Sequence, residues 1–270
     1  MIATPAHGAG STWDTPEAVD RILRAYATPD VAAVRSAQID LLGPIVGLAI
    51  LDVGSGPGVF ARDLALRGAT VTALDSAPAM LAAVADVAAA AGVRVATAEG
   101  EAMRIPFDDA SFDAAAIVQV LEYVPDAVGA LREIARVLRP GGRVLACDTD
   151  WGSAAWGIAD LDLADRVRTA WCGTKAHAAA GRAIPGWLVE AGFDVVGWSP
   201  VVLANADAVA GTFHAETWPS YRRVLERAEA LPTAELDRFE RLCAEATATG
   251  GFSFCVLRHA WVGRLAGGSR

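Results

Sequence analysis

The chain has 270 residues, of which 53% are hydrophobic and 20% are charged, and its formal net charge is −9. This composition excludes a mainly disordered chain, and the length suits one large α/β domain with an elaborated cap. Lys175 is the single lysine and no basic cluster occurs, so we expect neither a nucleic-acid partner nor binding to a membrane. We also expect a soluble cytoplasmic protein, because the N-terminal stretch lacks the features of a signal peptide.

The first half of the chain predicts two helices followed by alternating strands and helices. Both leading helices, within residues 14–43, have a proline in the first turn, at Pro16 and at Pro29. Strands are then expected at 49–53, 70–74, 93–98, 112–120 and 143–147, with helices at 59–67, 77–91 and 126–138 between them. This order at short spacing is typical of a parallel sheet covered by helices.

The pattern changes after residue 150. Residues 160–191 predict helix, interrupted at Gly181 and Pro185. Further strands are expected at 193–202 and 252–262, with a mostly helical segment at 207–248 between them. Two late strands joined by a long insertion predict an antiparallel hairpin on the edge of the sheet, and residues 205–250 are the expected cap.

The strongest local signal is a strand, a glycine-rich turn and a helix start, which read LDVGSGPG at residues 51–58. Such glycines let the backbone approach a ligand closely, and the helix N-terminus offers free N–H groups. Asp75 follows 21 residues after Gly54, where a carboxylate can accept both ribose hydroxyls of an adenosine. A dinucleotide fingerprint fails because its third glycine position falls on Val59, and no P-loop lysine follows. Asp52 beside the loop suits an ammonium group better than a diphosphate.

Four motifs carry a resemblance to a known family. They read LDVGSGPG from residue 51, ALDSAPAML from 73, AEGEAMRIPFDDASFDAAAIVQVLEYVPD from 98, and LREIARVLRPGGRVLACDTDW from 131. In these motifs the chain resembles the class I S-adenosylmethionine-dependent methyltransferases, and most of all the branch of ubiquinone/menaquinone C-methyltransferases and small-molecule methyltransferases (methyltransferase type 11). The resemblance is specific over residues 26–151, returns in FSFCVLRHAWVGR near the end, and is weak over 152–250. It implies a Rossmann-like α/β fold: a seven-stranded, mostly parallel sheet with helices on both faces, N-terminal helices, and a helical cap insertion before the last strand.

The resemblance also implies an S-adenosylmethionine site. Asp52 would orient the methionine ammonium, Asp75 would hold the ribose, and Tyr26 would close over the cofactor. Glu101 stands where the family usually has Asp, and it would accept from the adenine amino group. The other implied cofactor residues are Gly54, Ser55, Gly56, Ser76, Met80, Gly100, Ala102 and Gln119.

Candidate catalytic residues follow from the chemistry of methyl transfer, an in-line displacement in which the protein positions, desolvates and sometimes deprotonates the acceptor. His177 lies in a polar break between helices and His214 in the expected cap, so each is a candidate general base or an ordinary loop residue. Tyr123, after the fourth strand, would bind the acceptor by its hydroxyl or simply pack as an aromatic. Asp150 lies at the carboxyl edge of the sheet, where sites of open α/β sheets gather.

The remaining titratable residues are assigned lesser roles. His259, in the last predicted strand, is expected to be structural, and His7 is expected to be a bystander in the N-terminal tail. Asp148 and Asp150 would give a Mg²⁺ site only two ligands, and no third oxygen ligand is evident, so no metal is expected.

We therefore expect methyl transfer from S-adenosylmethionine to an O, N or C atom of a small, hydrophobic or aromatic metabolite, such as a secondary metabolite or a quinone-like acceptor. The alternative is a non-catalytic subunit that only binds the cofactor, and the failed third glycine disfavours a nicotinamide-dependent oxidoreductase. Residues 1–270 would form one domain, divided into helical cap (1–45), cofactor-binding core (46–150), variable acceptor and cap region (151–250), and last strand with tail (251–270). The oligomeric state is open, and a homodimer is compatible with the sequence.

Overall fold

The structure, a computed structural model, describes residues 13–266 of the chain. Within that part, seven strands form one sheet in the order β3-β2-β1-β4-β5-β7-β6. The strands are β1 (Ala49–Val53), β2 (Thr70–Asp75), β3 (Val95–Glu99), β4 (Phe112–Val118), β5 (Leu138–Gly157), β6 (Phe193–Asn205) and β7 (Ser253–Leu265). All neighbours from β3 to β5 pair in parallel, whereas β7 pairs antiparallel with both β5 and β6. The predicted Rossmann-like, mostly parallel sheet and its edge hairpin are confirmed.

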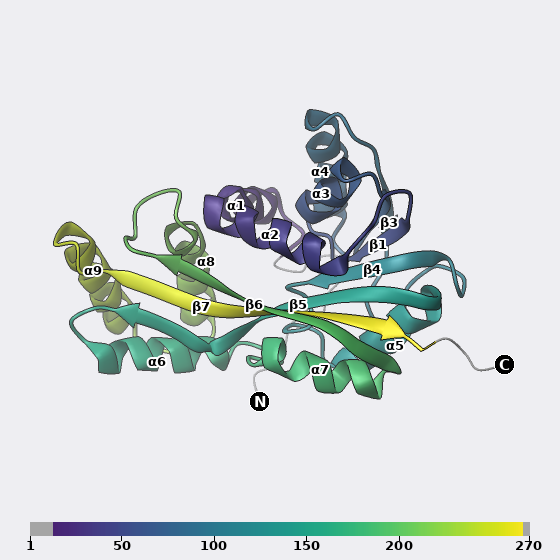
Figure 1. Cartoon of the computed structure of the whole chain (residues 1–270). Coiled ribbons are helices and arrows are strands. Elements are labelled where there is room, and N and C mark those ends of the chain that lie inside the picture. The colour runs from purple at the N-terminus through teal and green to yellow at the C-terminus, as the bar shows by residue number, and fades with distance from the viewer. Residues whose placement is uncertain (1–12, 267–270) are drawn as a thin grey trace.

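Helices cover both faces of this sheet (Figure 1). One face carries α1 (Pro16–Ala27), α2 (Pro29–Leu42), α3 (Val59–Leu66) and α4 (Pro78–Ala90), and the other carries α5 (Ala127–Val137) and α7 (Ala180–Glu190). The two predicted N-terminal helices are present, and the side chain of Thr15 caps the first by accepting from the Ala18 amide at 3.1 Å. Of the helices within residues 13–266, none has the combined length and apolar character that crossing a bilayer requires.

The central strands are buried on both faces, which explains their continuous apolar sequences. In β1 the four residues Ile50–Val53 are all buried between the two helical layers. Leu51 and Val53 belong to the hydrophobic core on the α5 and α7 side, whereas Ile50 packs in the core on the α2 and α3 side. This packing fixes the carboxyl ends of β1, β2 and β4 at one edge of the sheet.

The fifth strand is far longer than the sequence predicted. The prediction ended it at residue 147, but β5 continues to Gly157 with a register irregularity between Asp150 and Ala155. β7 and β6 run alongside it, so three strands extend past the rest of the sheet, as Figure 1 shows. The prediction stopped short because the polar run Asp148–Asp150 resembles a strand end, whereas these side chains are buried here.

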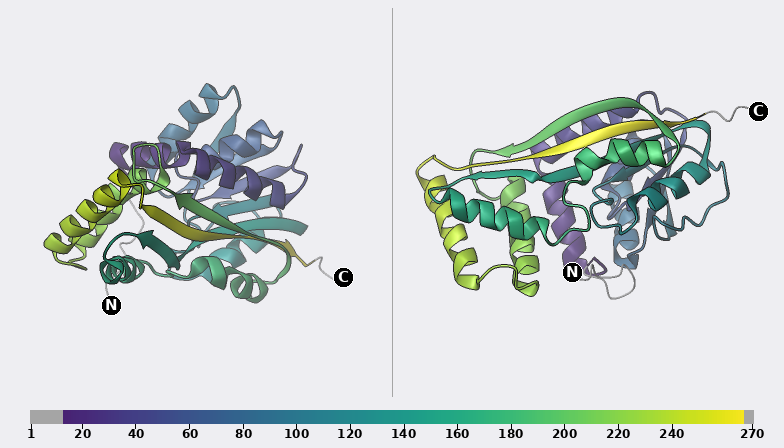
Figure 2. Two further views of the ribbon diagram at one scale, coloured as in Figure 1. Left: turned by 60° about the vertical axis from the view of Figure 1, so that its left-hand side comes forward. Right: turned by 90° about the horizontal axis from the view of Figure 1, so that it is seen from below.

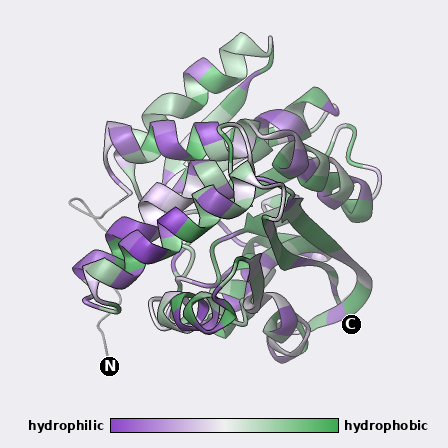
Figure 3. Cartoon of the chain, turned by 90° about the vertical axis from the view of Figure 1, so that its left-hand side faces the viewer, coloured by the Kyte–Doolittle hydropathy of each residue, from purple (hydrophilic) through white to green (hydrophobic). Residues whose placement is uncertain are grey.

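The extension of β5, β6 and β7 has a hydrophobic core of its own. It packs against α6 (Leu161–Cys172), α8 (Phe213–Arg227) and α9 (Thr233–Ala248), which lie together at one end of the molecule (Figures 1 and 2). Large aromatic side chains fill this core, among them Trp156, Phe239 and Phe254. Coloured by hydropathy, the strands are largely hydrophobic while the helices carry many hydrophilic positions (Figure 3). The helical insertion before the last strand is therefore part of a second packed region.

Two local predictions were wrong. Gly181 and Pro185 were expected to interrupt a helix, but both lie inside α7. A Cβ at Gly181 would approach the backbone oxygen of Asp148 to 2.6 Å, so glycine permits close packing of α7 on β5. The fourth strand was predicted to reach residue 120, but β4 ends at Val118 because Gln119 adopts a left-handed conformation with φ of 59°.

Candidate functional site

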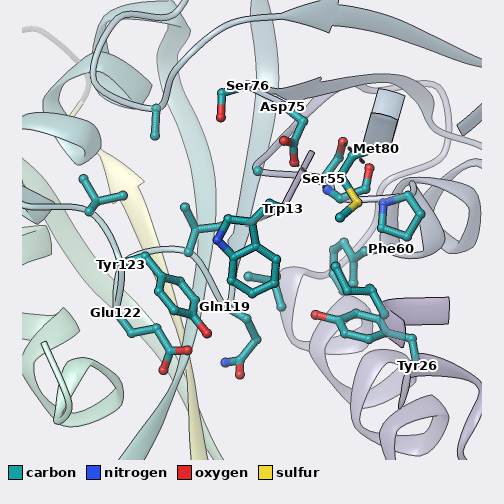
Figure 4. Close-up of a pocket in the computed structure, with 18 of the residues that line it drawn as sticks. Trp13, Tyr26, Ser55, Phe60, Asp75, Ser76, Met80, Gln119, Glu122 and Tyr123 are labelled. Carbon is teal, nitrogen blue, oxygen red and sulfur yellow. Dashed lines mark hydrogen bonds between the residues drawn. The ribbon is translucent and has the colours of Figure 1, made fainter. Parts of the chain in front are cut away.

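A cavity of about 460 Å³ opens at the carboxyl ends of β1, β2 and β4 (Figure 4). Its volume lies within the usual range of small-molecule sites. All twelve residues predicted to bind a cofactor line it: Tyr26, Asp52, Gly54, Ser55, Gly56, Asp75, Ser76, Met80, Gly100, Glu101, Ala102 and Gln119. The carboxyl edge of an open α/β sheet is where such folds bind ligands. The structure thus brings together one predicted set whose members are spread over more than ninety residues of sequence.

The glycine-rich turn between β1 and α3 forms one wall of the cavity. Gly54, Gly56 and Gly58 all have positive φ angles, of 68°, 52° and 80°. A Cβ at Gly54 would lie 2.4 Å from a methyl of Val120, whereas one at Gly56 would meet nothing within 4 Å. The turn therefore needs glycine both for its backbone conformation and for its close approach to the next loop.

Asp75 ends β2 and faces the glycine-rich turn. One oxygen of its carboxylate accepts from the Gly56 amide at 2.8 Å, and the other accepts from the Ala77 amide at 2.9 Å. These bonds hold the carboxylate at the edge of the cavity. Figure 4 shows Asp75 close to Ser55 and Met80, on the side of the cavity remote from Glu122.

Asp52 lies in β1, two residues before the first glycine of the turn, and is only 2% exposed. Its Oδ2 atom accepts no hydrogen bond from any residue in the part of the chain that is described. Burial, followed by the nearby charge of Asp75, raises the pKa of Asp52 to about 7. A cation placed in the cavity would supply the missing partner and restore the charged form of this carboxyl.

Gln119 turns the chain sharply at the end of β4. Its amide donates to the Cys147 carbonyl at 2.8 Å, and its side-chain oxygen accepts from the Thr149 hydroxyl at 2.7 Å. The left-handed backbone here is uncommon for a residue other than glycine, and such conformations concentrate at functional sites. The bonds to β5 hold the Gln119 side chain on the floor of the cavity.

The structure does not place His214 in the cavity. Its side chain is buried in the core of the extension, where its Nδ1 accepts from Trp156 Nε1 at 3.3 Å and its ring contacts Trp218, Phe252 and Phe254. Burial lowers the pKa of His214 to about 4. Among these aromatic rings His214 acts as a core residue, so the prediction that it is a general base is corrected.

His177 and Asp150 are also absent from the cavity lining. The ring of His177 packs against Trp187 at 5.0 Å between centroids, and its Nε2 is buried. Asp150 forms an ion pair with Arg182 at 2.9 Å, on the α7 side of β5. We therefore remove both residues from the candidate site.

Tyr123, His259 and His7 are the remaining residues to which the sequence analysis gave a role. Tyr123 lines the cavity, as expected. His259 stacks on Trp198 at the sheet edge, 6.2 Å between ring centroids, and lies outside the cavity lining. His7 lies outside the described residues.

A buried charged cluster missing from the sequence-based prediction lies beside Tyr123. Glu122 lines the cavity and accepts a hydrogen bond from Trp151 Nε1. Lys175, whose side chain is 3% exposed, lies 4.0 Å from Glu122 and donates to the Tyr123 hydroxyl at 3.2 Å. Its ammonium also lies 3.8 Å from the centroid of the Trp171 ring.

The protonation of this cluster follows from its burial. Burial lowers the pKa of Lys175 to about 8, although the charge of Glu122 opposes the shift. Burial, followed by the charge of Glu122, raises the pKa of Tyr123 well above its usual value, so the phenol stays protonated near neutral pH. The cluster thus offers a protonated hydroxyl and a carboxylate at the end of the cavity opposite Asp75, as Figure 4 shows.

Sequence reasoning also missed residues that the helical cap and the last strand contribute to this end. Tyr221, Thr217 and Phe213 come from α8, and Arg258 comes from β7. One signal was available: Lys175 is the single lysine in the chain and lies in a segment rich in tryptophan. The contacts of Arg258 had no such signal, because its partners are remote in sequence.

Comparison with known proteins gives the family of the central region. Residues 51–146 match the family described as "Methyltransferase domain". A demethylmenaquinone methyltransferase of Mycolicibacterium gilvum is 43% identical over 99 residues, which cover 37% of this chain and 41% of that protein. An uncharacterized 37.1 kDa protein in transposon Tn4556 of Streptomyces fradiae is 32% identical over 193 residues, covering 68% of this chain and 54% of that one. The chain thus spans about half the length of these curated relatives.

A solved structure extends the likeness in fold beyond that region. A crystal structure of a putative methyltransferase from Bacillus halodurans aligns with a TM-score of 0.61 at 18% identity, covering 87% of this chain and 99% of that one. At this identity the likeness shows the fold alone. With the matched sequence family, the glycine-rich turn and Asp75 in place, residues 51–146 of this chain belong to the class I S-adenosylmethionine-dependent methyltransferase family.

Proposed function

We propose that the protein transfers the methyl group of S-adenosylmethionine to an O, N or C atom of a small, hydrophobic or aromatic metabolite. One observation carries the proposal: a single cavity joins all twelve candidate cofactor residues to a second, aromatic end that holds a buried charged cluster. The cofactor and an acceptor can therefore share one enclosed space, as direct methyl transfer requires.

The residues at the first end fit S-adenosylmethionine. The Asp75 carboxylate would take the ribose hydroxyls, and the open face of Gly56 would let the cofactor approach the backbone. The buried Oδ2 of Asp52 would accept from the methionine ammonium, which explains a carboxyl oxygen kept there without a partner. Glu101 and Ala102 line the cavity where the adenine would lie. When bound, the cofactor supplies an electrophilic methyl group on a sulfonium centre.

The second end would hold the acceptor. Trp13, Tyr123 and Tyr221 line it, and the Trp13 and Tyr123 rings meet edge to face at 5.4 Å between centroids. Aromatic walls of this kind bind flat or apolar molecules and keep water away from the reacting atoms. The demethylmenaquinone methyltransferase among the relatives supports a quinone-like acceptor as one member of this class.

Proton transfer, where the acceptor needs it, would fall to the Glu122 cluster. The Tyr123 hydroxyl, held by Lys175, would hydrogen-bond the acceptor heteroatom and keep its lone pair directed at the methyl group. The Glu122 carboxylate would take the proton that the acceptor loses as the new bond to the methyl carbon forms. Lys175 would balance the charge of Glu122 in the free enzyme. These roles replace the histidines that the sequence nominated.

The test is methyl transfer from labelled S-adenosylmethionine into a native extract that is afterwards separated by size. Label in the low-mass fraction supports the proposal, and mass spectrometry then identifies the acceptor. Label in protein or nucleic acid would contradict the proposed substrate class. Cofactor binding without transfer to any fraction would favour the alternative of a non-catalytic cofactor-binding subunit. The cytoplasmic location, the homodimer and the division into cap, core and acceptor regions stay predictions.

A further inference from the structure

Arg258 is a buried cation in the wall of the cavity. It lies on β7 opposite Thr149 of β5, and it is 4% exposed. Its Nε donates to the Thr149 hydroxyl at 3.3 Å, and its guanidinium carbon lies 5.3 Å from the centroid of the Phe213 ring. Neither contact supplies a negative charge.

The nearby acids are engaged elsewhere. Among the described residues, no carboxylate oxygen lies within 4.0 Å of the Arg258 guanidinium. Glu122 has Lys175 and the Trp151 indole as partners, and Asp148 accepts from the backbone amides of Thr149 and Glu122. A buried charge is costly when it is left without a counter-charge.

A second buried arginine, Arg35, serves as the comparison because its role is structural. Arg35, on α2, is 5% exposed and outside the cavity lining. It forms an ion pair with Asp63 at 2.9 Å and also donates to the Tyr26 carbonyl. Arg35 is therefore paired directly with a carboxylate of the protein, whereas Arg258 has no such direct ion pair among the described residues.

The same end of the cavity carries another positive charge. Arg21 of α1 lines the cavity and stacks over the Trp13 ring at 5.3 Å. It too has no carboxylate within 4.0 Å among the described residues. Two arginines from opposite ends of the chain thus converge on the aromatic part of one cavity without acidic partners.

We propose that the guanidinium of Arg258 binds an oxyanion, a carboxylate or a phosphate, of a small molecule held in this cavity. Guanidinium groups bind carboxylates and phosphates through two parallel hydrogen bonds, and Arg21 adds positive potential at the same end of the cavity. This inference rests on the proposed function, under which either of two molecules can carry the oxyanion. One is the methyl acceptor, and the other is the cofactor, at its methionine end. In the first case the acceptor is an acid with an aromatic or apolar body.

The experiment measures ligand affinity by calorimetry on the full chain and on Arg258→Gln and Arg258→Lys. The probes are S-adenosylhomocysteine, its decarboxylated analogue, benzoate, phenyl phosphate and neutral benzyl alcohol, the last three with and without S-adenosylhomocysteine. If the acceptor brings the oxyanion, Arg258→Gln weakens benzoate or phenyl phosphate at least about tenfold, spares benzyl alcohol, and Lys restores part of the loss. If the cofactor brings it, the same variant weakens S-adenosylhomocysteine but not the decarboxylated analogue.

Equal affinities of the wild type and Arg258→Gln for every probe would overturn the proposal. Failure of the wild type to bind S-adenosylhomocysteine would count against the proposed function, while the benzoate and phenyl phosphate titrations still decide the role of Arg258. Melting temperatures give an independent reading. Arg258→Gln removes an uncompensated charge, so its melting temperature is expected to equal or exceed that of the wild type, whereas Arg35→Gln lowers it. A large decrease for Arg258→Gln would indicate a structural arginine and contradict the proposal.

Discussion

The two ends of the cavity belong to regions built in different ways. Much of the cofactor end is formed by turns at the carboxyl ends of β1 and β2, so each of those residues is placed by the strand next to it. The other end collects Glu122 after β4, Lys175 after α6, Tyr221 of α8 and Arg258 of β7. The first region presents backbone amides and glycines, and the second presents buried side-chain charges among aromatic rings. The difference indicates that the cofactor end follows from motifs at the ends of predictable strands, whereas the other end depends on how the extension packs.

The largest expected effect is a loss of stability in the extension of β5, β6 and β7 that leaves cofactor binding unchanged. Phe239 is fully buried there and contacts the rings of Trp156 and Trp218, so Phe239→Ala should lower the free energy of unfolding by about 3–5 kcal/mol. The affinity of the folded variant for S-adenosylhomocysteine should stay unchanged, because Phe239 is not in the cavity lining. Denaturant unfolding and calorimetry measure the two quantities. A tenfold weaker affinity would show that the two regions are coupled.

The next effect tests the charged cluster. Glu122→Gln keeps an acceptor for the Trp151 indole but removes the carboxylate. Turnover of the acceptor found by label transfer should fall about 100-fold, with unchanged affinity for S-adenosylhomocysteine, because proton transfer is lost while the cofactor end is intact. Single-turnover kinetics measures the methyl-transfer step. Wild-type turnover in this variant would exclude Glu122 as the proton acceptor.

A matched pair of acids tests the cofactor end. Asp75→Ala should weaken S-adenosylhomocysteine by about 2–3 kcal/mol, since charge-assisted hydrogen bonds to the ribose are lost. Glu99 ends β3 directly beside Asp75 but is exposed and outside the cavity lining, so Glu99→Ala should bind as the wild type does. Calorimetry compares the two. Equal affinities in both variants would mean that Asp75 does not hold the ribose.

The smallest effect is a pH dependence at the cofactor end. Asp52 has a pKa of about 7, raised mainly by burial, so the folded chain binds a proton there that the unfolded chain releases near pH 4. Stability of the free protein should therefore fall as pH rises from about 4 to about 7, while affinity for the cationic methionine end should rise over the upper part of that range.

The control for this pH dependence is Asp52→Asn, which should lose both trends. The expected change in the dissociation constant of S-adenosylhomocysteine between pH 6 and pH 8 is about tenfold in the wild type. Titrations in buffers of different ionisation enthalpy should also detect a proton released on binding near pH 6.5. Binding that is independent of pH in the wild type would contradict a role for Asp52 in holding the ammonium.

The same contrast explains how far the sequence could be interpreted. Asp52, Asp75 and Gln119 were placed correctly at the cavity because each lies at the carboxyl end of a strand, and parallel strands end at one edge. His214 was misplaced because a histidine in a polar helical segment gives no sign that aromatic rings will bury it.

The residues of the acceptor end could not be predicted from the sequence, for a related reason. Arg258 lines the cavity beside Thr149, in the part of β5 that runs on past its predicted end at residue 147. Lys175 lies outside the lining and reaches the site through Glu122 and Tyr123. The register that pairs Thr149 with Arg258 is set by long-range strand pairing, and no local pattern encodes it. Buried charges are likewise defined by their partners, which come from remote segments.

The most direct test of the central claim is the affinity of the purified wild type for S-adenosylhomocysteine compared with NAD, measured by calorimetry and by melting temperature. We expect S-adenosylhomocysteine to bind and to raise the melting temperature, NAD to do neither, and Asp75→Ala to remove the effect. Stabilisation by NAD, or no response to S-adenosylhomocysteine, would contradict the assignment of the cavity to S-adenosylmethionine.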